Sequence, residues 1–220
     1  MSTWGARDES HRVHLGYRYV DREKVLIYAR AGRKLAKAAG NVVPAEPAEG
    51  DEKNWVIEGP LTDIRASYTS LGEGAYLVPN LGAWEGRYVC EVWADSEKFK
   101  TSPKFLVDET TQDFPSNDKA WDRMLSKYHK TMDRTIIAAR LPRVQVYAMR
   151  IPPRYLPPSS WTVGSLWKPK SDLGITVRCV AKRNLQALTI RDPVNWGQWW
   201  PKLNSENSAW MNAIGTQYDL

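Results

Sequence analysis

The feature that most constrains the fold is a run of short strand-like segments between Asn54 and Glu109. Residues that favour strands dominate each segment, and glycine, proline, asparagine and aspartate separate the segments at short intervals. Many short strands with regular turns predict an antiparallel β-sandwich or barrel. The expected strands of this run are 54–58, 63–70, 75–78, 87–94 and 103–108.

Strand signals also flank this run. Residues 13–20 and 24–31 precede it, and residues 143–151 and 173–181 follow it. Each of these segments is rich in β-branched and aromatic residues. Together with a single long helix, they predict an α+β protein that is mostly β.

That helix is expected over residues 116–140. Ser116 is a good N-cap residue, and Pro142 disfavours helical geometry at the residue before it. At roughly 100° per residue, the apolar positions of the segment gather on one face and its cations on the opposite face. The segment therefore predicts an amphipathic helix with a cationic stripe. The stripe consists of Lys119, Arg123, Lys127, Lys130 and Arg134.

The segment from Trp84 to Val92 contains Tyr88 two residues before Cys90. It resembles the Gly-x-Tyr-x-Cys corner that opens strand F of immunoglobulin-like domains. The resemblance implies an N-terminal immunoglobulin-like sandwich, in which residues 93–107 form the F–G hairpin and strand G. No cysteine precedes Cys90, so the inter-sheet disulfide of antibody domains is excluded. The pattern is more similar to the disulfide-free immunoglobulin-like modules of viral and phage structural proteins.

Cys90 and Cys179 are the only cysteines, and neither lies in a Cys-x-x-Cys motif. Two buried free thiols and one long-range bridge both remain open.

The polar N-terminus of mixed charge does not have the pattern of a secretory signal, and no apolar run approaches the ~18 residues of a membrane span. We expect a reducing, intracellular site of synthesis and a location in a virion or the host cytoplasm.

The net charge of +6 is distributed unevenly. Residues 116–193 carry fifteen lysines and arginines against five acidic residues, whereas residues 1–115 and 194–220 are slightly acidic. We therefore expect a sandwich (1–115), a basic helix with strands (116–193) and a C-terminal arm (194–220). A basic segment of this kind favours a polyanionic partner, RNA or DNA. The candidate binding residues are Lys119, Arg123, Lys127, Lys130, Arg134, Arg140 and Arg143.

The C-terminal arm is poor in charge and rich in tryptophan. Large aromatic residues with few charges are typical of the buried centre of an interface. We therefore expect the arm to contact copies of this chain or other structural subunits. The candidate interface residues are Trp196, Trp199, Trp200 and Trp210.

Motifs of catalysis are lacking. The sequence contains no phosphate-binding loop, no Gly-x-Ser-x-Gly and no His-Glu-x-x-His. His11 and His14 are expected on opposite faces of a strand, which argues against a metal site there. The sequence predicts a non-catalytic structural subunit without cofactors, in a viral or phage particle, or alternatively a basic nucleic-acid-binding protein.

Overall fold

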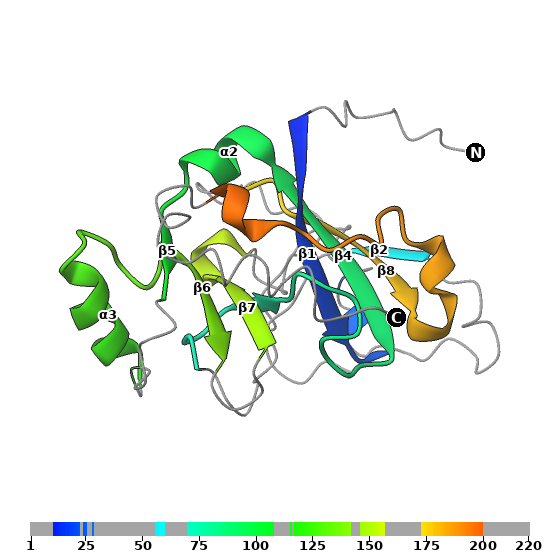
Figure 1. The fold of residues 1–220 in the computed structure, drawn as a ribbon, viewed down its shortest axis with the longest axis horizontal. Helices are drawn as coiled ribbons and strands as arrows, with labels where there is room; N and C mark the ends of the chain where they lie inside the picture. Colours follow the sequence, from blue (N-terminus) through cyan, green and yellow to red (C-terminus); the bar gives the residue numbers. More distant parts are fainter. Residues whose placement is uncertain are drawn as a thin grey trace, which may run out of the picture.

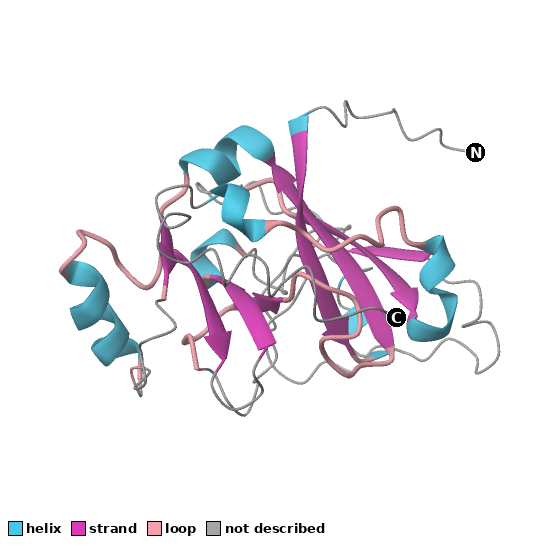
Figure 2. Ribbon diagram, viewed as in Figure 1, coloured by secondary structure: helices cyan, strands magenta, loops and turns pink. Residues whose placement is uncertain are grey.

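The structure is a computed structural model, and its strands form two sheets (Figure 1). The strand order is β1-β4-β8-β2 in the first sheet and β3-β7-β6-β5 in the second. Figure 2 shows the two groups of strands side by side, with short helices around them. The structure describes residues 11–22, 24–25, 28, 56–59, 70–107, 115, 117–141, 146–156 and 173–199.

Neighbouring strands run antiparallel, except β5 and β6, which are parallel. The two sheets meet where Tyr17 and Val78 exchange two backbone hydrogen bonds of 2.8 Å. The strands are β1 (Arg12–Val20), β2 (Val56–Gly59), β3 (Ala75–Leu77), β4 (Tyr88–Asp95), β5 (Lys104–Leu106), β6 (Ile136–Leu141), β7 (Val146–Ile151) and β8 (Thr176–Ala181). The helices are α2 (Ser96–Thr101), α3 (Asp118–Ser126), η3 (Pro153–Tyr155), η4 (Lys182–Ala187) and η5 (Trp196–Trp199).

The mostly β class is confirmed, and most expected strands are present within a few residues of their predicted ends. The expected strand at 24–31 is wrong for its described residues, because Lys24, Val25 and Tyr28 are helical. The Asp21 carbonyl accepts hydrogen bonds from the backbone N–H groups of Lys24 and Val25. Burial of Val25 and Tyr28, three residues apart on one helical face, outweighs their preference for strands.

The expected F–G hairpin is also wrong. Helix α2 follows β4, with Asp95 as its N-cap, and β5 then joins the second sheet instead of pairing with β4. The expected strand at 63–70 lies outside the described residues except for Ser70, which is in a turn. Both sheets combine strands from residues 1–115 with strands from residues 116–193.

The long helix at 116–140 is wrong: α3 covers only Asp118–Ser126, and Asn117, not Ser116, is its N-cap. The Lys130 N–H donates to the Leu125 carbonyl at 3.1 Å, and His129 has a left-handed φ of 56°, a pairing that terminates helices. Histidine is among the residues enriched in this conformation. The β-branched residues Ile136 and Ile137 then open β6.

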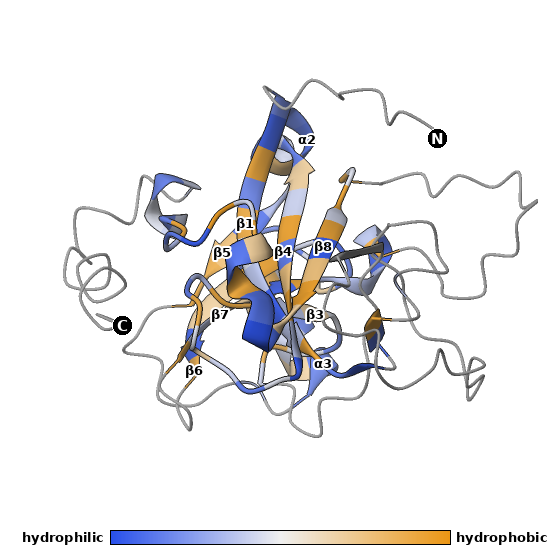
Figure 3. Ribbon diagram, turned by 90° about the vertical axis from the view of Figure 1, so that its right-hand side faces the viewer, coloured by the Kyte–Doolittle hydropathy of each residue, from blue (hydrophilic) through white to orange (hydrophobic). Residues whose placement is uncertain are grey.

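The larger hydrophobic core involves strands of both sheets, and a smaller one lies under α3. Trp121 of α3 is completely buried in the smaller core, and its indole N–H donates to the Ser70 carbonyl at 3.2 Å. Figure 3 shows that hydrophobic positions dominate β8, whereas the helices are mostly hydrophilic. Strand residues therefore make up much of the larger hydrophobic core.

Cys90 and Cys179 form a disulfide bond, so the alternative of two free thiols is wrong. The two residues face each other directly in the ladder between β4 and β8, and both are completely buried. The bond joins the two central strands of the first sheet. A sequence cannot show this pairing without knowledge of the register between two strands that are far apart along the chain.

Candidate functional site

A basic pocket of about 290 Å³ opens where three strands of the first sheet end. Arg22 follows the end of β1, Arg87 precedes β4, and Lys182 and Arg183 follow β8. Gly86, Tyr88 and Ala181 complete the wall. The antiparallel pairing of β4 with both β1 and β8 places these three chain segments at one end of the sheet.

The chain passes close to β1 at Gly86. A Cβ atom at Gly86 would lie 3.0 Å from both the Tyr19 Cβ and the Val20 nitrogen, so a larger residue would have to displace β1 slightly. On the other side, the Lys182 N–H donates to the Arg87 carbonyl at 2.8 Å. These contacts fix the backbones that carry the cations.

The basic pocket concentrates positive charge. Among the described residues that line it, four are lysine or arginine and none is acidic. Arg87, Lys182 and Arg183 are exposed, and Arg22 is partly buried. Cations that converge on a concave surface create a positive potential that attracts anions, and the effect weakens as salt rises.

The predicted nucleic-acid-binding residues do not form one stripe in the structure. Lys119 and Arg123 are exposed on α3, and Lys127 is its exposed C-cap. Arg140 is on β6, with its guanidinium 5.8 Å from the centre of the Tyr147 ring. Arg143 lies outside the described residues. Lys130 and Arg134 line a second pocket of about 610 Å³, together with Pro103, His129, Thr131, Asp133 and Thr135.

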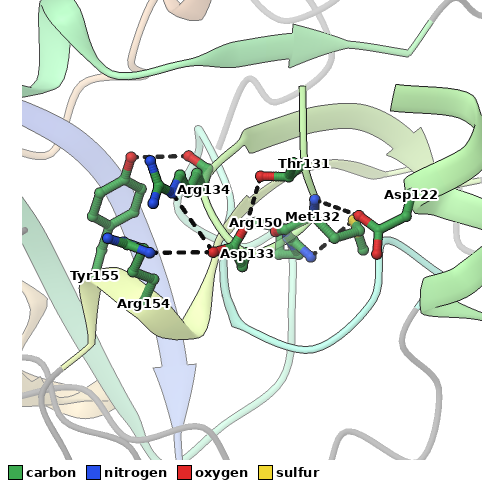
Figure 4. A network of polar contacts seen from close by, with 8 residues as sticks. All are labelled: Asp122, Thr131, Met132, Asp133, Arg134, Arg150, Arg154 and Tyr155. Atoms are coloured by element: carbon green, nitrogen blue, oxygen red, sulfur yellow. Dashed lines mark hydrogen bonds and ion pairs between the residues drawn. The ribbon is translucent and has the colours of Figure 1, made fainter. Parts of the chain in front are cut away.

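The acidic group of this second pocket is already paired with cations. The Asp133 carboxylate lies 3.4 Å from Arg154 and 3.7 Å from Arg134, and it accepts a hydrogen bond from the Thr131 hydroxyl at 2.5 Å (Figure 4). The Thr131 hydroxyl, with Arg154 and Arg134, lowers the pKa of Asp133. The Tyr155 hydroxyl donates to the Arg134 carbonyl at 2.9 Å. The second pocket therefore has a mixed charge, unlike the basic pocket.

Arg150 on β7 supports the loop between α3 and β6. Its side chain is almost completely buried and donates to the Met132 carbonyl (Figure 4). It also donates to the Thr135 carbonyl at 3.0 Å. The Met132 N–H donates to the Asp122 carboxylate of α3 at 2.8 Å. Burial lowers the pKa of Arg150 to about 10, so the guanidinium stays charged at neutral pH. Arg150, one of the cations that the sequence suggests for nucleic-acid binding, therefore has a structural role instead.

A second buried polar group lies beneath the segment 188–196. The Glu91 carboxylate of β4 is completely buried and accepts the Ile190 N–H at 2.6 Å. The Tyr17 hydroxyl lies 2.9 Å from the Asp192 carbonyl. Burial raises the pKa of Glu91 and of Tyr17, because water no longer stabilises their charged forms. Neither residue lines either of the two pockets. Their hydrogen bonds hold the segment 188–196 onto the first sheet.

The predicted interface tryptophans have different positions. Trp196 is completely buried in the protein's own core, and its indole N–H donates to the Leu15 carbonyl at 2.7 Å. The expectation that Trp196 contacts another polypeptide is therefore corrected, because none of its surface is exposed. Trp199 is half-buried and meets the Phe99 ring edge-on, with 4.9 Å between ring centres. Trp200 and Trp210 lie outside the described residues.

The described part of the chain contains no group of three or more histidine, cysteine, aspartate or glutamate side chains placed to hold a metal ion. His14, a sequence-level metal candidate, is buried between the rings of Tyr17 and Trp93. Of the helices in the described residues, none has the length and apolar character needed to cross a membrane.

Residues 69–204 match a family of unknown function, DUF5910, and because this match covers more than half of the sequence the chain belongs to that family. No curated protein and no solved structure matches the chain. The matched range includes Arg87, Lys182 and Arg183 of the basic pocket, whereas Arg22 precedes it.

Proposed function

We propose that this protein is a non-catalytic binding protein whose basic pocket receives phosphate groups of single-stranded RNA or DNA. The observation that carries this proposal is the convergence of four cations on one concave site whose described lining residues include no acidic one. Arginine binds phosphate groups with good geometry, because its planar fork can donate two parallel hydrogen bonds to them.

The proposal moves the expected nucleic-acid contact from the helix stripe to the ends of the strands. On α3 the cations alternate with Asp118 and Asp122. An exposed ion pair contributes only about 0.2–1 kcal/mol, so scattered cations bind weakly, whereas several around one phosphate act together. Binding through such contacts must weaken steeply with salt, because counterions are released from the nucleic acid.

The other expectation, a structural subunit of a viral or phage particle with an immunoglobulin-like module, stays a prediction. Its key residue Trp196 is buried internally, and Trp200 and Trp210 lie outside the described residues. Contact with copies of the chain or with other subunits likewise stays a prediction.

The test is binding of a fluorescently labelled single-stranded oligonucleotide to the full chain, followed by anisotropy at low and moderate salt. We expect the double variant Lys182→Glu/Arg183→Glu to lose most of the binding. The matched control is Lys119→Glu/Arg123→Glu, which changes charge equally on the exposed face of α3 and should bind nearly as well as the parent. Loss of binding in the α3 variant alone would contradict the proposal and return the site to the helix.

A further inference from the structure

On the basis of the proposed function, we further propose that the basic pocket recognises a terminal phosphate monoester, such as the 5′-phosphate of a nucleic-acid strand, in preference to an internal phosphodiester. Three features of the basic pocket support this preference for a monoester: its shape, its charge and the fixed backbone of its walls.

The shape favours a chain end. Three separate segments wall the pocket, at Arg22, at Gly86–Tyr88 and at Ala181–Arg183. Its volume of about 290 Å³ is just below the size of typical small-molecule sites, roughly 300–1,000 Å³. An internal phosphodiester must leave the pocket in two directions, because a sugar follows on each side. A monoester needs one exit only, so it can enter more deeply among the cations.

The charge favours the same ligand. A phosphate monoester carries about −1.5 to −2 at neutral pH and has three terminal oxygens that accept hydrogen bonds. A diester carries a single negative charge. The attraction to each surrounding cation scales with the ligand's charge, so a site with four cations gains more from a monoester than an isolated lysine does. The cations Lys119, Arg123 and Lys127 of α3 line neither of the two pockets, so they surround no such ligand.

The walls are held before any ligand arrives. The disulfide Cys90–Cys179 lies two ladder positions from the pair Tyr88–Ala181, which lines the pocket. Close packing at Gly86 and the hydrogen bond between the Lys182 N–H and the Arg87 carbonyl fix the other sides. Little backbone ordering therefore opposes binding.

The experiment compares two single-stranded oligonucleotides of identical sequence, one with a 5′-phosphate and one with a 5′-hydroxyl, each labelled at the 3′ end. We expect the full chain to bind the phosphorylated strand about tenfold more tightly at 100 mM salt, which corresponds to about 1.4 kcal/mol and is within reach of a few ion pairs. The double variant Arg87→Gln/Lys182→Gln should lose this preference. The control variant Lys119→Gln/Arg123→Gln on α3 should keep it.

Competition identifies the recognised group. Adenosine 5′-monophosphate should displace the phosphorylated strand, whereas adenosine should not. If an excess of the monophosphate left the preference for the phosphorylated strand intact, the inference would be overturned. If both strands bound equally and the pocket variant weakened both, terminal recognition would be refuted while the proposed function stands. If neither strand bound, the proposed function itself would fail, and this inference with it.

Discussion

Reduction of the Cys90–Cys179 bond is the perturbation whose effect follows most directly from the structure. The bond spans a sequence separation of 89 residues and joins the central strands β4 and β8. For a loop of this length, the loop-closure relation gives a stabilisation of about 4.6 kcal/mol at 25 °C, through restriction of the unfolded chain. We expect reduction to lower the free energy of unfolding by about 3–5 kcal/mol.

The assay is urea unfolding of the full chain, followed by tryptophan fluorescence with and without dithiothreitol. With a slope of about 2 kcal/mol per molar urea, the midpoint should fall by about 2 M in the reduced protein. The double variant Cys90→Ser/Cys179→Ser is the control, and its midpoint should not respond to the reductant.

The reasoning would be refuted if thiol titration of the denatured, unreduced protein found two free thiols, or if the two midpoints coincided. Disulfides form and persist mainly in oxidising environments. The thiol count in protein taken from its native source therefore also tests the expected reducing site of synthesis.

Three further predictions follow from buried polar and aromatic groups. Replacement of Arg150 by methionine leaves the carbonyls of Met132 and Thr135 without their buried donor, so urea unfolding should show a loss of about 2–4 kcal/mol; an unchanged midpoint would contradict the assigned role. Trp196→Ala should cost about 3–5 kcal/mol and leave the oligomeric state in light scattering unchanged, whereas dissociation of an oligomer would show that Trp196 is an interface residue after all. Burial lowers the pKa of His14 to about 4, below its usual value of 6.5, so the folded state disfavours the protonated ring. Stability should therefore fall as the pH drops from about 6.5 to 4, and thermal unfolding of His14→Gln should show a shallower fall over that range; parallel pH curves would count against it.

The strands could be predicted because their signals are local. Residues 13–20, 87–94 and 173–181 alternate or cluster β-branched and aromatic side chains, and they became β1, β4 and β8. The helix could not be delimited in this way. Met132 and Ile136 continue the helical spacing of apolar residues beyond Leu125, but the left-handed conformation of His129 ends the helix first.

The basic pocket could not be predicted from the sequence, for a different reason. Lys182 and Arg183 are neighbours along the chain, but Arg22 and Arg87 join them only through the pairing of β1, β4 and β8. No repeating pattern in the sequence indicates that these three segments lie side by side. The register that places Cys90 opposite Cys179 is equally non-local, so neither the disulfide nor the pocket could be assembled from spacing alone.

The most direct test of the proposed binding site is lysine footprinting on the full chain. Acetylation of surface lysines, read by mass spectrometry with and without a bound single-stranded oligonucleotide, reports which cations the ligand covers. The account predicts strong protection of Lys182 in the basic pocket and little change at Lys119 and Lys127 near α3. Protection of Lys119 and Lys127 with Lys182 still fully reactive would contradict it.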